Sequence, residues 1–204
     1  MQNIKAIIFD FGGVILNIDF SRVNKAFYEL GVIDFDKIYS QKNAAPLFQD
    51  LEVGKTNEQE FYRSFKNITN PSLTDLQIQN AWNSMLLSFR EEALQTLKAI
   101  KPKYKLFLLS NTNIIHLNAF NKIYGEQVGG GLLHNYFDKV YYSHEIGYRK
   151  PDKEAYEYVL TENNLLPSET LFIDDTFQNI EAAKYLGMQT IFLANGKGIE
   201  DLNL

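Results

Sequence analysis

Three short apolar runs in this sequence each end in polar residues of kinds that take part in chemistry. One run ends in Asp10, a second in Ser110 and Asn111, and a third in Asp174 and Asp175. If these runs are parallel strands, their carboxyl ends meet at one edge of a sheet. Several carboxylates so close together repel one another unless a cation neutralises them. Because carboxylate oxygens favour a hard ion, the pattern predicts a site for Mg²⁺.

A basic residue is expected beside these carboxylates. Lys150 stands in the run Arg149–Asp152, just after another apolar segment. A lysine ammonium is a compact charge that suits a phosphate group. Carboxylates, a divalent ion and a lysine at one sheet edge favour phosphate chemistry.

The elements that must position these residues alternate along the chain. Continuous apolar runs of this length are typical of parallel strands covered on both faces. Helical patterns separate them, so we expect an α/β fold with a doubly wound, Rossmann-like parallel sheet. The expected strands are Lys5–Asp10, Lys105–Ser110, Lys139–Ser143, Leu171–Asp174 and Thr190–Leu193.

The segment between the first two strands has a different character, because it shows helical stripes and no convincing strand. Two capping boxes are expected in it, Thr56 with Gln59 and Thr74 with Gln77. We therefore predict a core domain of residues 1–16 and 90–204 and a helical cap of residues 17–89. A module inserted there lies over the carboxyl edge of the sheet, where it can act as a lid.

Composition excludes several classes of protein. The chain has 204 residues, 45% of them apolar, which is typical of a globular protein. Without cysteine it has no disulfide, thiolate zinc site or cysteine nucleophile. A net charge of −5 and no basic run argue against nucleic acid, and no apolar run is long enough to span a membrane. We expect a cytoplasmic protein; its oligomeric state cannot be predicted.

Four motifs together resemble the haloacid dehalogenase-like hydrolase superfamily. They follow the family's order and, with the residues after the last motif, extend over residues 8–183. The helical insertion resembles the family's small helical cap. The glycine of the first motif and the runs Ile18–Phe20 and Tyr148–Pro151 resemble the α-D-glucose-1-phosphate phosphatase-like branch. The motifs are Ile8–Val14, Leu109–Thr112, Lys150–Asp152 and Phe172–Asp175.

The resemblance implies a role for each motif residue. Asp10 would be the nucleophile that forms an aspartyl-phosphate. Ser110 and the amide of Asn111 would bind phosphoryl oxygens, and Lys150 would neutralise charge in the transition state. The implied ligands of Mg²⁺ are Asp10, the carbonyl of Gly12 and Asp175, with Asp174 bound directly or through water.

Gly12 departs from the pattern of most phosphatases in this family. They carry an acid–base Asp at that position, a group that typically contributes about 10²–10⁴-fold to the rate. The ligand role of the backbone carbonyl survives at Gly12, whereas the acid–base role does not. A sugar 1-phosphate would need little help in leaving, and Asp19 is considered as a substitute acid.

We therefore expect a Mg²⁺-dependent phosphatase for a small phosphorylated metabolite, most simply a sugar phosphate. The alternative, motivated by Gly12, is an impaired phosphate- and metal-binding regulatory protein. A metal-free dehalogenase and a phosphomutase remain further alternatives. Three residues of the insertion are considered as substrate contacts, although a structural or surface role is preferred for each: Phe20, Arg22 and Trp82. The three histidines are expected to be surface or hydrogen-bonded residues.

Overall fold

A five-stranded parallel sheet forms the centre of the computed structural model, which describes residues 3–39, 44–194 and 197–204. The strand order is β5-β4-β1-β6-β7, so the chain winds outward from β1 in both directions. All four neighbouring pairs are parallel. This confirms the predicted doubly wound fold and all five predicted strands, within one residue at most of their ends. The strands are β1 (Ala6–Phe9), β4 (Lys105–Ser110), β5 (Lys139–Tyr142), β6 (Thr170–Asp174) and β7 (Gln189–Phe192).

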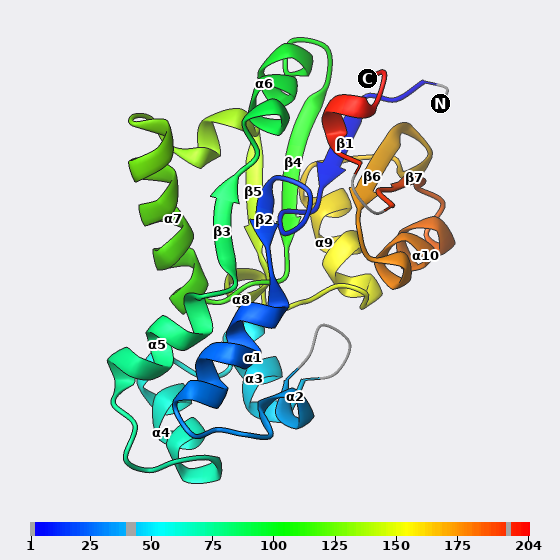
Figure 1. Ribbon diagram of the computed structural model, residues 1–204. Helices are drawn as coiled ribbons and strands as arrows, with labels where there is room; N and C mark the ends of the chain where they lie inside the picture. Colours follow the sequence, from blue (N-terminus) through cyan, green and yellow to red (C-terminus); the bar gives the residue numbers. More distant parts are fainter. Residues whose placement is uncertain (1–2, 40–43, 195–196) are drawn as a thin grey trace.

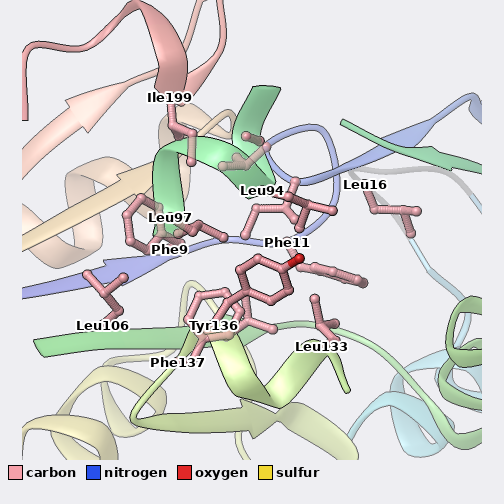
Figure 2. Close-up of a cluster of buried hydrophobic side chains, with 14 of the residues drawn as sticks. Phe9, Phe11, Leu16, Leu94, Leu97, Leu106, Leu133, Tyr136, Phe137 and Ile199 are labelled. Carbon is pink, nitrogen blue, oxygen red and sulfur yellow. The ribbon is translucent and has the colours of Figure 1, made fainter. Parts of the chain in front are cut away.

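Helices cover both faces of this sheet (Figure 1). Ile7 and Phe9 of β1 face one apolar cluster together with α6 and α7, while Ala6 and Ile8 face a second cluster with α9 and α10. Figure 2 shows the first cluster, in which Phe9 lies near Leu97. Successive side chains of a strand point to opposite faces of the sheet, and both sets of residues are buried because helices cover both faces. The helices are α6 (Glu91–Ile100), α7 (Ile114–Val128), α8 (Ser143–Ile146), α9 (Lys153–Glu162) and α10 (Phe177–Tyr185).

The remaining helices form a group at the carboxyl edge of the sheet, here called the helical module (Figure 1). Its interior is a separate cluster of aromatic side chains, in which the Phe48 ring contacts five others at 4.8–6.3 Å between centroids. The module consists of α1 (Phe20–Glu29), α2 (Phe35–Ile38), α3 (Pro46–Glu52), α4 (Glu58–Ile68) and α5 (Asp75–Asn83).

Two short antiparallel strands join the helical module to the sheet. They are β2 (Leu16–Ile18) and β3 (Leu86–Phe89), one at each end of the inserted segment. The prediction that residues 17–89 contain no strand was therefore wrong. Three and four residues are too few to show the alternation that reveals a strand, and the two segments pair only because the module brings its ends together.

The predicted helix starts are partly correct. Thr74 and Gln77 form the expected capping box at the start of α5. The other box is one residue later than predicted, because Asn57 and Glu60 form it while the Thr56 hydroxyl contacts the Glu60 carboxylate at 3.2 Å. Asn is the better N-cap of the two adjacent candidates.

Three short 3₁₀ turns complete the described chain: η1 (Leu133–Tyr136), η2 (Pro167–Glu169) and η3 (Ile199–Asp201). None of the described helices is long and apolar enough to cross a bilayer.

Candidate active site

A cavity of about 470 Å³ lies where the carboxyl edge of the sheet meets the helical module. Its sheet side includes Asp10, Ser110, Lys150 and Asp175. The structure therefore brings together side chains that are up to 165 residues apart in the sequence. The parallel strands cause this, since Asp10 follows β1, Ser110 ends β4 and Asp175 follows β6.

The Lys150 ammonium lies between two carboxylates at this edge. Its Nζ donates to Asp10 Oδ1 at 2.5 Å and to Asp174 Oδ2 at 2.9 Å. Burial opposes the charged form of Lys150, but the attraction of Asp10 and Asp174 outweighs it and raises the pKa of the ammonium. Lys150 is therefore a fixed positive charge beside Asp10.

The adjacent carboxylates of Asp174 and Asp175 differ in their surroundings. Asp174 is fully buried and accepts hydrogen bonds from Lys150 Nζ, from Asn179 Nδ2 at 2.9 Å and from the Thr176 backbone N–H at 2.7 Å. Asp175 lines the cavity and accepts a 3.3 Å hydrogen bond from the Thr176 hydroxyl. The Asp174 oxygens are hydrogen-bonded to other groups of the protein, whereas Asp175 faces the cavity.

The three carboxylates carry more negative charge than Lys150 offsets. One oxygen from each of Asp10, Asp174 and Asp175 lies within 4.8 Å of the others. Burial, reinforced by the charge of Asp174, raises the pKa of Asp10 to about 7. Burial and Asp174 likewise raise the pKa of Asp175. A divalent cation would relieve this repulsion, so the donor set fits Mg²⁺.

Asn111 positions the loop that carries Lys150. Its side-chain Nδ2 donates to the Lys150 carbonyl at 2.8 Å, and the Lys150 backbone N–H donates to Asn111 Oδ1 at 2.8 Å. Ser110 and Asn111 both line the cavity, so the end of β4 and the Lys150 loop are held against each other there.

Two glycines after Asp10 allow close approaches. A Cβ on Gly13, which has a φ of +76°, would lie 2.1 Å from Asp175 Oδ2. A Cβ on Gly12 would lie 2.3 Å from the Ile18 side chain, which therefore occupies the space of a side chain at position 12. The usual acid–base carboxyl is absent here, and the apolar Ile18 lies in its place.

The proposed substitute acid, Asp19, does not fit that role. It is the partly exposed N-cap of α1 and accepts hydrogen bonds from the Ser21 backbone N–H at 2.9 Å and from the Ser21 hydroxyl at 2.6 Å. These hydrogen bonds lower the pKa of Asp19, and Asp19 is not one of the described residues that line the cavity. Asp19 is a helix cap, as its position after β2 and before α1 explains.

The part of the cavity wall nearest the helical module contains charged and polar residues that the sequence did not single out. Glu52 of α3 and Arg149 form an ion pair, with 3.1 Å between Oε2 and Nη2. Tyr39 and His116 also line the cavity. Only the position of Arg149 next to Lys150 could have pointed to one of them, because the others come from segments with no motif.

His116 connects the sheet to the helical module. Its Nδ1 lies 2.9 Å from Asn83 Oδ1, within hydrogen-bond distance. The ring stacks on Trp82, with 4.7 Å between centroids. Its buried Nε2 has no hydrogen-bond partner among the described residues, so the expected hydrogen bonding of His116 holds at Nδ1 and not at Nε2. Burial lowers the pKa of His116 to about 3, which keeps the ring neutral.

Of the three residues considered as substrate contacts, only Phe20 lines the cavity. Trp82 is buried in the aromatic interior of the helical module, and Arg22 is exposed. The preferred structural or surface roles agree with these positions of Trp82 and Arg22.

Comparison with known proteins agrees with this architecture. The haloacid dehalogenase-like hydrolase family matches residues 4–187. The chain belongs to this family. It is 34% identical over 194 residues to a D-ribitol-5-phosphate phosphatase from Bacteroides thetaiotaomicron, covering 95% of this chain and 93% of that protein. The chain is therefore a phosphoric monoester hydrolase of the family, as its sequence predicted.

Solved structures of family members show the same fold, and one of them contains a cation. A variant of a family enzyme from Bacteroides thetaiotaomicron, in complex with magnesium and inorganic phosphate, superposes with a TM-score of 0.89 at 30% identity, over 95% of this chain and 96% of that one. A family hydrolase from Porphyromonas gingivalis gives 0.87 at 33% identity, over 96% and 94%. Magnesium is thus present in a close structural neighbour, and this chain has a carboxylate cluster that could hold it.

Proposed function

We propose that this protein is a Mg²⁺-dependent phosphatase for a small hydroxylated phosphate ester, a sugar or sugar alcohol phosphate. The observation that carries the proposal is the cluster of Asp10, Asp174 and Asp175 around one buried ammonium at the edge of a cavity. A D-ribitol-5-phosphate phosphatase that is similar over nearly the whole chain supports the substrate class.

In the proposed reaction, an Asp10 carboxylate oxygen attacks phosphorus while the bond from phosphorus to the ester oxygen breaks. The electron pair of that bond goes to the leaving oxygen, which takes a proton, and Asp10 becomes an aspartyl-phosphate. Water then attacks the phosphorus, and the bond from phosphorus to the Asp10 oxygen breaks with its electron pair returning to the carboxylate. One proton of the water stays on the released inorganic phosphate and the other passes to solvent. Lys150 holds positive charge beside the phosphoryl oxygens throughout, and Ser110 with the Asn111 amide bind those oxygens.

We propose that Asp10, the Gly12 carbonyl and Asp175 hold the Mg²⁺ ion. Bound there, the ion would supply Lewis-acid stabilisation of charge on the phosphoryl oxygens. Asp174 would lie outside this set of direct ligands, because its oxygens already accept hydrogen bonds from Lys150, Asn179 and Thr176. The helical module, residues 17–89 in the proposed division, would then be the cap that covers the substrate, with core residues 1–16 and 90–204 holding the phosphate.

Without a carboxyl at position 12, the reaction depends on how basic the leaving oxygen of the substrate is. Two substrates that differ in this property show whether the leaving oxygen is protonated by another group. We would measure phosphate release from glucose 1-phosphate and from D-ribitol 5-phosphate with Mg²⁺. A strong preference for glucose 1-phosphate would mean that a less basic leaving oxygen needs no acid. Efficient hydrolysis of ribitol 5-phosphate would mean that water or another group protonates its alkoxide.

One observation favours a second function. The Ile18 side chain fills the space beside Gly12, so the site could bind a phosphate group without turning it over. A protein with this binding function would bind inorganic phosphate in the presence of Mg²⁺ and would hydrolyse neither ester. Hydrolysis of either ester, lost in Asp10→Asn, would exclude it.

A further inference from the structure

The cavity wall also carries an ion pair that is not part of the carboxylate cluster. Glu52 belongs to α3 of the helical module, and Arg149 precedes Lys150 in the loop between α8 and α9. Both line the cavity, and their side chains are 10% and 26% exposed. The guanidinium thus lies at the wall of the cavity with a largely buried carboxylate against it.

Both positive charges that line the cavity in the described residues are already paired. Lys150 contacts Asp10 and Asp174, and Arg149 contacts Glu52 at 3.1 Å. In the proposed function, one phosphate group would contact Lys150 and the cation that the carboxylate cluster would hold. A second anionic group on the substrate would find Arg149 neutralised and the Glu52 carboxylate repelling it.

We propose that Glu52 is a specificity-determining residue that excludes substrates with a second negative charge, by holding Arg149 in an ion pair. This rests on the proposed phosphatase function and narrows its substrate class to monophosphates whose remaining part is neutral. Glu52 acts through Arg149 and is a positioning residue. The exclusion is a form of specificity that depends on an unfavourable contact with the wrong ligand.

The consequence is a gain of function on removing one charge. Glu52→Gln keeps the size of the side chain and frees the guanidinium, which then lacks a partner in a half-buried wall. A carboxylate on the substrate would supply that partner. The variant should therefore accept phosphorylated sugar acids that the wild type rejects.

The test uses two esters that differ at one carbon, glucitol 6-phosphate with a terminal CH₂OH and 6-phosphogluconate with a carboxylate. The wild type should prefer glucitol 6-phosphate in kcat/KM. Glu52→Gln should lower this preference at least tenfold, mainly through a lower KM for 6-phosphogluconate. Arg149→Gln should raise the preference, and Glu52→Gln/Arg149→Gln should lose the gain. Glu29→Gln, an exposed change on α1, is the matched control and should leave the preference as in the wild type.

Three results would overturn the inference. They are an unchanged preference in Glu52→Gln, an equal gain in the double variant, and an equal gain in Glu29→Gln. Thermal unfolding of each variant shows whether it is folded. The dissociation constants of both esters, measured by calorimetry in an Asp10→Asn background, test the same selectivity without turnover. If the wild type hydrolyses no ester at all, the proposed function fails, while these binding constants still decide the role of Glu52.

Discussion

At the scale of single residues, two features define the site. One is the ion-pair network of Asp10, Lys150 and Asp174, and the other is the absence of a carboxyl at Gly12. Lys150 holds Asp10 on one side and Asp174 on the other, so Asp10 is aligned by a buried contact of 2.5 Å. The Asp174 carboxylate is hydrogen-bonded within the protein, so Asp175 is the one of these two adjacent aspartates that faces the cavity. The two aspartates share a sequence motif but differ in position because strand β6 ends between them.

The first prediction concerns the space beside Asp10. In Gly12→Asp/Ile18→Ala, the smaller residue at 18 makes room for a carboxyl that could protonate the leaving oxygen. We expect the ratio of kcat/KM for D-ribitol 5-phosphate to that for p-nitrophenyl phosphate to rise about 10²-fold, since general acids contribute about 10²–10⁴-fold. The nitrophenolate leaves without a proton and so serves as the internal reference. Ile18→Ala alone is the control; a ratio equal in both variants would contradict the explanation.

At the scale of elements, the strands of the parallel sheet and the motif residues at their ends could be predicted from sequence, whereas the contacts between distant segments could not. The buried strands were recognisable because each is a continuous apolar run, and Asp10, Ser110 and Asp175 follow from the places where these runs end. The pair β2–β3 and the contacts of Glu52 and His116 depend on segments that meet only after folding. Periodicity within one segment carries no information about such contacts.

The start of α4 provides a prediction about local stability. The Asn57 side chain accepts from the Glu60 backbone N–H at 3.0 Å, and the Glu60 carboxylate accepts from the Asn57 backbone N–H at 3.3 Å. Asn57→Ala should lower the free energy of unfolding by about 1 kcal/mol, because it removes this cap. Asp152 at the start of α9 makes no side-chain cap bond and is the matched control. Urea unfolding at pH 7 checks the difference; an equal loss in Asp152→Ala would contradict it.

The junction of α5 and α7 provides a prediction about pH. His116 has a folded-state pKa of about 3, below the ordinary value of 6.5, so the unfolded chain binds more protons between these values. Stability should therefore be fully present above pH 6.5 and fall as the pH is lowered, by about 1.4 kcal/mol per unit. Between pH 7 and pH 5 the wild type should lose about 2 kcal/mol more than His116→Asn. Urea unfolding at both values tests this; parallel losses in the two proteins would refute it.

At the scale of the whole molecule, the sheet with its two apolar clusters and the helical module with its own cluster meet at one cavity. The sheet and the helical module both line this cavity, and the module lies at the carboxyl edge of the sheet (Figure 1). In the proposed function, the sheet side would hold the phosphate and the helical module would contact the rest of the substrate, so that one fold could vary its substrate through the inserted helices. The boundaries at residues 17 and 89 and the expected cytoplasmic location remain predictions.

The most direct test is phosphate release from p-nitrophenyl phosphate by the wild type and by Asp10→Asn, with Mg²⁺ and with EDTA. The predicted result is release by the wild type in Mg²⁺ that is lost both on adding EDTA and in Asp10→Asn. This substrate removes the missing acid from the question, because its leaving group needs no proton. A folded wild type that releases no phosphate, or release that persists in EDTA or in Asp10→Asn, would contradict the account.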